Sequence, residues 1–126
     1  MEDLIREFLS LKKIAVVGSF RNEQKVAYQI VRNLLSRGYE VYPVNPNTKE
    51  VAGLKCYKSI IELPDGIEGL DIVTPPLATE KIVEDALKKG IRNIWIQPGA
   101  ESEKAVRFCE DNNMSVIHNL CIMVTW

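Results

Sequence analysis

The most constraining feature of the sequence is its regular alternation of short apolar runs with segments of helical periodicity. Ile14–Val17, for example, is a continuous apolar run, which is typical of a strand buried on both faces. Strands that alternate with helices of this length favour a parallel sheet, because parallel strands need long, right-handed crossovers. We therefore predict an α/β fold: a doubly wound parallel sheet of five to six strands with helices on both faces.

The expected elements can be placed along the chain. Strands are expected at residues 14–17, 39–46, 54–57, 70–76, 93–99 and 114–118. Helices are expected at residues 4–9, 26–35, 80–89 and 101–113. Gly38 and Gly90 should close the second and third helices, and Thr79 should cap the start of the third. No segment reads as an interdomain linker, so residues 1–126 are expected to form a single domain.

Composition excludes several classes of protein. With 16 basic and 17 acidic residues the net charge is -1, whereas binders of duplex nucleic acid normally carry a basic excess. No apolar run approaches the length of a membrane span, and the acidic, amphipathic N-terminus is no secretory signal. Three cysteines without a C-x-x-C and a single histidine argue against a metal site. An odd number of thiols fits a reducing compartment, so we expect a cytoplasmic protein.

The loops at the carboxyl ends of the strands are where a ligand is expected, because doubly wound sheets bind ligands near the point where strand order reverses. After the first strand, Gly18 permits a tight turn and Ser19 offers a hydroxyl. Lys25 is expected in the first turn of the next helix, where a cation is disfavoured unless an anion accompanies it. This pattern predicts a phosphate-bearing ligand, and the alternative is a solvated lysine on a polar helix face.

Ordinary NAD binding fits the sequence poorly. The G-x-G-x-x-G fingerprint is missing, because its second glycine is Phe20. NAD also needs a carboxylate at the end of the second strand. Glu40 stands at the start of that strand instead, and residues 45–49 contain no acid.

The loops after the fourth and fifth strands are open to two interpretations. Thr74-Pro75-Pro76 forms either a stiff, apolar wall over the ligand crevice or a simple strand stop. Gln97 begins a segment that either offers an amide to a ligand or makes a plain turn.

Candidate catalytic groups are few, and we assign none. Ser19 has no neighbouring histidine in sequence, and the single histidine, His118, is expected to be structural. Cys121 is expected either to be a small buried residue or to face the crevice, where it could form a mixed disulfide with a ligand thiol. The acids near the fourth strand are expected to be solvated: Asp65, Glu68 and Asp71.

Six motifs in order resemble a known family. They are IAVVGSFRNEQK, GYEVYPVNPN, GLKCYKSIIELP, DIVTPP, NIWIQPGAES and CIMV, and they extend over residues 13–124. The family is that of the small stand-alone coenzyme A-binding proteins with a Rossmann-like fold, which are similar to the CoA-binding domain of the succinyl-CoA synthetase α subunit.

The resemblance implies that the chain binds coenzyme A (CoA) or an acyl-CoA. The loop at Gly18 and the helix behind it would hold the CoA phosphates, and the loops after the second and fourth strands would border the nucleotide. The residues so implied, with Gln97 as a further candidate, are Gly18, Ser19, Phe20, Arg21, Lys25, Asn45, Pro46, Asn47, Thr74, Pro75 and Pro76.

The chain also departs from the family pattern. The usual glycine-alanine-serine turn is Gly18-Ser19-Phe20, and the glycine normally found two residues after the lysine is Ala27. Both changes should crowd the phosphate loop slightly. The phosphorylated histidine of the synthetase lies outside its CoA-binding domain and has no counterpart here.

The expected function is a non-catalytic carrier, sensor or module, with a protein partner or a homo-oligomer as possibilities and no nucleic-acid or membrane partner. Two alternatives stay open at this stage. One is an NAD(P)-dependent oxidoreductase-type domain, and the other is a protein-interaction scaffold that binds no ligand.

Overall fold

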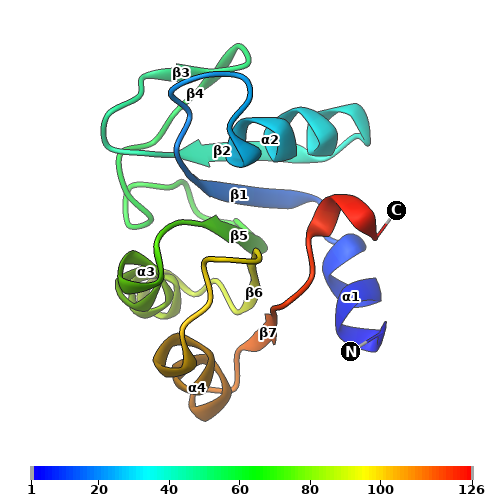
Figure 1. Cartoon of the computed structure of the whole chain (residues 1–126), viewed down its shortest axis with the longest axis vertical. Helices are drawn as coiled ribbons and strands as arrows, with labels where there is room; N and C mark the ends of the chain where they lie inside the picture. Colours follow the sequence, from blue (N-terminus) through cyan, green and yellow to red (C-terminus); the bar gives the residue numbers. More distant parts are fainter. Residues whose placement is uncertain (1, 126) are drawn as a thin grey trace.

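The computed structural model describes residues 2–125 and contains a five-stranded parallel sheet between layers of helices (Figure 1). The strands are β1 (Lys13–Gly18), β2 (Glu40–Val44), β5 (Gly69–Val73), β6 (Asn93–Ile96) and β7 (Ser115–Ile117). The helical elements are α1 (Glu2–Leu9), α2 (Val26–Ser36), α3 (Pro76–Lys89), α4 (Glu103–Asp111) and a short 3-10 helix, η1 (Ile122–Val124). The strand order β2-β1-β5-β6-β7 confirms the predicted doubly wound α/β fold.

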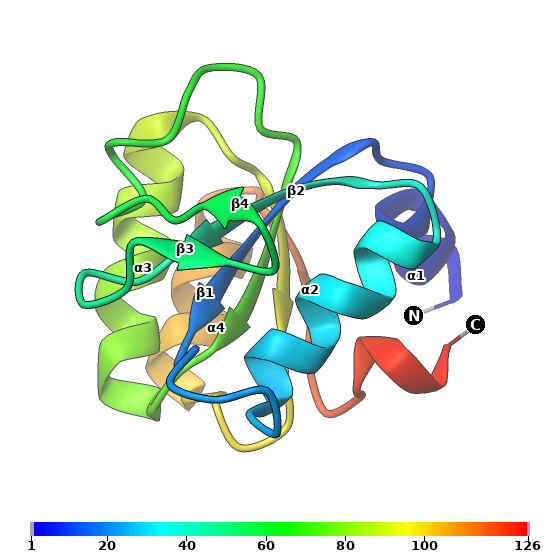
Figure 2. The same ribbon diagram turned by 90° about the horizontal axis from the view of Figure 1, so that it is seen from above.

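Side chains of β1 alternate between two hydrophobic cores. Ile14 and Val16 pack in the core under α1, α2 and η1, whereas Ala15 and Val17 pack in the core under α3 and α4. Figure 2 shows the two groups of helices on opposite faces of the sheet. Both faces of β1 are therefore buried, as its continuous apolar run predicted. Every helix within residues 2–125 is too short or too polar to span a lipid bilayer.

Strand order reverses beside β1, and doubly wound sheets generally bind their ligands at such a reversal. β1 pairs with β2 on one side and with β5 on the other, and Gly18 at its end pairs with Val73. The chain reaches β5 from β2 through an antiparallel hairpin of β3 (Glu50–Val51) and β4 (Leu54–Lys55). The reversal thus brings the β1–α2 loop next to the end of β5.

The expected strand at residues 54–57 is not part of the main sheet. Leu54 and Lys55 pair with β3 in a separate two-stranded sheet. Only Tyr57 reaches the main sheet, where it forms an isolated parallel bridge to Val44. The reason is the two-residue turn between β3 and β4, which reverses the chain before it can run beside β2.

This turn leads to a prediction about stability. Ala52 and Gly53 have φ angles of 50° and 81°, as a type I′ turn requires, and an alanine in this region is strained. Ala52→Asn should raise the free energy of unfolding by roughly 0.5–1 kcal/mol, because asparagine tolerates the left-handed conformation. Urea unfolding of the two proteins measures the change, and an unchanged or lower midpoint would contradict it.

The predicted cap at Thr79 is wrong. Helix α3 begins at Pro76, with Pro75 as its N-cap, because the ring of Pro76 sets a helical φ at a position that needs no N–H. Thr79 lies inside the helix and is buried, with its hydroxyl 2.8 Å from that of Thr74. The glycines expected to close helices do so, since Gly38 and Gly90 follow α2 and α3 with φ angles of 89° and 84°.

The expectation of a solvated Asp71 is also wrong. Asp71 lies in the middle of β5, between Val16 and Trp95 on the neighbouring strands, and it is fully buried. The strand begins at Gly69, so the turn ends before this carboxyl. Glu68, by contrast, is exposed and accepts hydrogen bonds from the backbone N–H groups of Lys12 and Lys13 at 2.8 and 2.9 Å.

Candidate functional site

Gly18 ends β1 at a point where no side chain fits. A Cβ atom there would lie 2.7 Å from Cβ of Ala27 and 2.8 Å from the carbonyl oxygen of Val73. The glycine therefore lets the first turn of α2 come close to the ends of β1 and β5. Ala27 contributes to this crowding, because its methyl group occupies the space beside Gly18.

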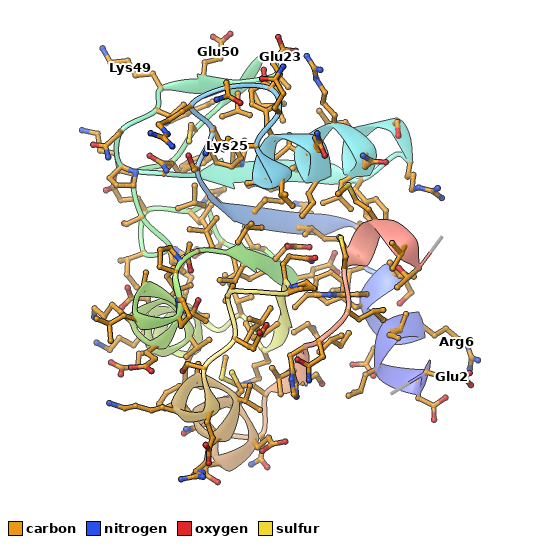
Figure 3. The ribbon with its side chains drawn as sticks, viewed as in Figure 1. Glu2, Arg6, Glu23, Lys25, Lys49 and Glu50 are labelled. Carbon is orange, nitrogen blue, oxygen red and sulfur yellow. The ribbon has the colours of Figure 1, made fainter. Side chains whose placement is uncertain are left out.

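Lys25 is the N-cap residue of α2, one position before the helix in which it was expected. Its side chain makes no capping hydrogen bond and is half-buried. The N–H groups of the first helical turn point to the same region, where they favour an anion. In the described chain, neither Lys25 nor the exposed Arg21 forms an ion pair. The acid of this loop, Glu23, pairs with Arg32 instead, on the outer side of the loop (Figure 3).

Phe20 anchors the β1–α2 loop in the hydrophobic core. Its side chain is buried and packs edge-on against Tyr28 of α2, with 6.5 Å between ring centroids. The residue that replaces the second glycine of the dinucleotide fingerprint therefore belongs to the hydrophobic core. Phe20 would meet a ligand only through its backbone, whereas the neighbouring Ser19 is half-buried.

Asn45 connects the loop after β2 to the loop after β1. Its side-chain amide donates a hydrogen bond to the carbonyl oxygen of Gly18 at 2.6 Å, and its Oδ1 accepts one from the N–H of Asn47 at 2.8 Å. The side chain is thus committed to positioning the two loops. Pro46 and Asn47 are exposed beside it.

The segment after β2 leads into a basic groove that the sequence analysis missed. The groove has a volume of about 500 Å³ and is lined by Pro46, Asn47, Thr48, Lys49, Lys55, Cys56 and Lys58. Three lysines between positions 49 and 58, against one acid, were the signal in the sequence. In Figure 3, Lys49 projects from the segment before β3 and Lys25 lies at the start of α2.

The ends of β5 and β6 border a second, smaller hollow. It has a volume of about 300 Å³ and is lined by Val73, Thr74, Pro75, Pro98, Gly99 and Ala100. No charged side chain lines it. The Thr74 hydroxyl is bonded to Thr79 inside α3, so prolines and backbone make up much of the wall. Pro76 is exposed at the first position of the helix.

The side chain of Gln97 is committed to hydrogen bonds within the fold. It is buried, and its Nε2 donates to both carboxylate oxygens of Asp71 at 3.0 Å. Its Oε1 accepts a hydrogen bond from the N–H of Ile122 at 3.1 Å. Burial raises the pKa of Asp71 from 3.8 to about 8, and the hydrogen bond from Gln97 opposes this shift only in part. In the sequence, the signal for the buried pair of Asp71 and Gln97 was an acid within the apolar run of β5.

The three cysteines lie in different surroundings. Cys56 and Cys109 are buried, and burial raises the pKa of both thiols, that of Cys109 to about 12. Cys121 is half-buried at the start of η1. Its segment is held on both sides, because Nε1 of Trp95 donates to the Leu120 carbonyl at 2.8 Å and Ile122 donates to Gln97. Within residues 2–125, no three metal-ligating side chains gather into a possible metal site.

Two further grooves border α4, and both carry acids. The first, about 520 Å³ between α3 and α4, is lined by Glu80, Glu84, Glu103, Lys104, Ala105, Arg107, Phe108 and Asp111. The second, about 350 Å³, contains His118 among Glu101, Glu103 and Glu110. Carboxylates in these numbers repel a polyanion. The lysine-lined groove after β2 and the β1–α2 loop with Lys25 are therefore better suited to phosphate groups.

Comparisons with known proteins identify the family to which the chain belongs. A family model described as "CoA binding domain" matches residues 12–126. Acetate–CoA ligase (ADP-forming) of Methanocaldococcus jannaschii is 37% identical over 92 residues, covering 73% of this chain and 13% of the ligase. The uncharacterized protein YneT of Bacillus subtilis is 29% identical over 121 residues, covering 95% of this chain and 90% of YneT.

Solved structures show the same architecture. A conserved hypothetical protein from Pyrococcus furiosus superposes with a TM-score of 0.87 at 42% sequence identity, covering 92% of this chain and all of that one. The chain spans less than a fifth of the length of the ADP-forming ligases from M. jannaschii and Archaeoglobus fulgidus that it matches. By contrast, it covers 90% of YneT and all of the P. furiosus protein.

Proposed function

The chain belongs to the CoA-binding domain family, and we propose that it binds coenzyme A or an acyl-CoA. We propose that residues 1–126 act as a single cytoplasmic domain, with the ligand lying across the carboxyl ends of β2, β1, β5 and β6. The role is that of a non-catalytic carrier, sensor or module. The relatedness to acetate–CoA ligases supports the class of ligand.

The observation that carries this proposal is the order of three features along one edge of the sheet. Because β1 lies between β2 and β5, the loop with Lys25 lies between the lysine groove and the uncharged hollow. CoA has a matching layout, with a phosphorylated adenosine at one end, a diphosphate in the middle and an uncharged pantetheine arm at the other. Each part of the ligand would meet groups of complementary charge or polarity.

The second candidate is NADP, which the lysines beside β2 also favour. Basic side chains at the end of this strand accommodate the 2′-phosphate of NADP in dinucleotide-binding folds. The β1–α2 loop argues against it, because it lacks the G-x-G-x-x-G fingerprint of dinucleotide-binding folds and has Phe20 at the second glycine. Titration with NADPH, followed by its fluorescence, separates the two ligands: NADPH binding without CoA binding would favour the dinucleotide.

A non-catalytic role is supported by the positions of Ser19 and His118, which lie in different parts of the fold. Among residues 2–125, His118 lines the acidic groove beside α4 rather than the β1–α2 loop that contains Ser19. If the chain binds a partner protein tightly and CoA not at all, the scaffold alternative would replace our proposal.

Lys25→Ala tests the site directly. Removing this ammonium should weaken CoA binding by about 1.5–3 kcal/mol, or roughly 10- to 150-fold in Kd, the scale of a hydrogen bond to a charged group. Isothermal titration calorimetry measures the affinity. Lys88→Ala is the matched control, since Lys88 is exposed in the last turn of α3. Equal affinities of the wild type and Lys25→Ala would favour the alternative, in which Lys25 is a solvated side chain on a polar helix face.

A further inference from the structure

We propose that Lys55 and Lys58, with Lys49 at the rim, bind the 3′-phosphate of CoA, so that the protein distinguishes CoA from dephospho-CoA. This inference rests on the proposed function and assigns one ligand group to one set of side chains. It concerns specificity, because dephospho-CoA differs from CoA only in lacking that phosphate.

The groove combines positive charge with polar groups that suit a phosphomonoester. Its three lysines lie with the side chains of Asn47 and Thr48, and no carboxylate lines it. A phosphomonoester carries up to two negative charges near neutral pH and three strong acceptor oxygens. Three ammonium groups around one concave surface repel one another until an anion enters.

None of the three lysines is neutralised by a neighbouring acid. Over residues 2–125, no carboxylate lies within 4.0 Å of the Nζ atom of Lys49, Lys55 or Lys58. Glu50 is the backbone pairing partner of Lys55, but their side chains form no ion pair. The Nζ of Lys55 instead lies 4.9 Å from the ring centroid of Tyr57, which holds the ammonium in place without removing its charge.

The groove is also held in a fixed position relative to the β1–α2 loop. The N–H of Ala52 in the hairpin turn donates to the Tyr28 hydroxyl of α2 at 3.2 Å. On the other side of the hairpin, Tyr57 exchanges two hydrogen bonds of 2.9 Å with the backbone of β2 and the following residue. The residue that follows β2 is Asn45, and its side chain donates a hydrogen bond to the carbonyl oxygen of Gly18. The lysines of the groove are therefore held at a fixed distance from Lys25, where we propose that the CoA diphosphate binds.

Calorimetric titration of CoA and of dephospho-CoA, at one fixed salt concentration, tests the assignment. The proteins are the wild type, the double variant Lys55→Met/Lys58→Met and the control Lys88→Met/Lys104→Met, whose lysines lie on α3 and α4. Methionine keeps the unbranched shape of lysine and removes its charge. Circular dichroism and thermal melting confirm that each variant is folded.

We expect the wild type to bind CoA at least about tenfold more tightly than dephospho-CoA. The hairpin double variant should lose that preference by weakening CoA alone, and the control should keep it. Equal affinities of the wild type for the two ligands would overturn the assignment. So would a double variant that weakens both ligands equally, which would indicate general attraction of anions. Binding of neither ligand would overturn the proposed function itself, and this assignment with it.

Discussion

Asp71→Asn is expected to raise the free energy of unfolding by several kcal/mol at pH 8 and to leave it almost unchanged near pH 4. Asp71 is fully buried in β5, and among residues 2–125 the amide of Gln97 is the one group that donates hydrogen bonds to its carboxyl. Burial raises its pKa from 3.8 to about 8. A difference of this size corresponds to roughly 6 kcal/mol between the two protonation states.

The sign follows from proton linkage. Between about pH 4 and 8 the folded protein keeps the proton on Asp71, whereas the unfolded chain releases it. The stability contributed by this group is therefore largest at low pH and falls as the pH rises through that window. Asparagine resembles the neutral carboxylic acid and does not titrate, so the advantage of the variant should grow with pH and level off above pH 8.

Urea unfolding of the wild type and the variant at pH 4, 6 and 8 measures this difference, and other titrating groups cancel in the comparison. Glu68→Gln is a control of opposite sign. Backbone N–H groups of Lys13 and Lys12 lower the pKa of Glu68, so this variant should lose stability at neutral pH and approach the wild type in acid. A stability difference for Asp71→Asn that does not vary with pH would rule out a buried titrating carboxyl.

Gly18→Ala is expected to destabilise the fold and to abolish detectable CoA binding. The added methyl group would lie 2.7 Å from Cβ of Ala27 and 2.8 Å from the Val73 carbonyl oxygen, so α2 or β5 must move. Overpacking of this kind typically costs about 1–3 kcal/mol. The movement would displace Lys25 and the first turn of α2, which the proposed site requires in place. Thermal unfolding and CoA titration measure the two effects.

The double variant Gly18→Ala/Ala27→Gly shows which contact matters. Removing the methyl of Ala27 relieves one of the two clashes and leaves the carbonyl of Val73 in place. We expect the free energy of unfolding of the double variant to lie between those of Gly18→Ala and the wild type. The recovery is incomplete because a glycine within a helix itself costs stability. If Gly18→Ala alone melted and bound CoA like the wild type, close approach of α2 would not be the reason for this glycine.

The main architecture could be predicted because each of its elements carries a local signal. The apolar run at Ile14–Val17 is buried on both faces, and Gly38 and Gly90 end their helices. The strand-end loops were found by the same reasoning, since polar residues follow each buried run. The family resemblance was confirmed by a match over residues 12–126.

The errors concern residues whose roles depend on distant partners. Gln97 could not be recognised as buried, because its hydrogen bonds go to Asp71 and Ile122 in other segments. Leu54–Tyr57 has the composition of a sheet strand, and only the turn at Ala52 diverts it into a hairpin. The lysine groove exists only once that hairpin packs beside β2. Sequence periodicity reports burial along one element and carries no information about which elements meet.

The pairing of β1 with β5 has a consequence for folding kinetics. Val17 and Ile72 are direct neighbours in the sheet although the whole of α2, β2 and the hairpin separates them along the chain. Closing so large a loop is entropically costly and slow compared with forming either helix. The proposed ligand crevice lies at this junction, so in a refolding experiment CoA binding should appear late, after most helical signal has already returned.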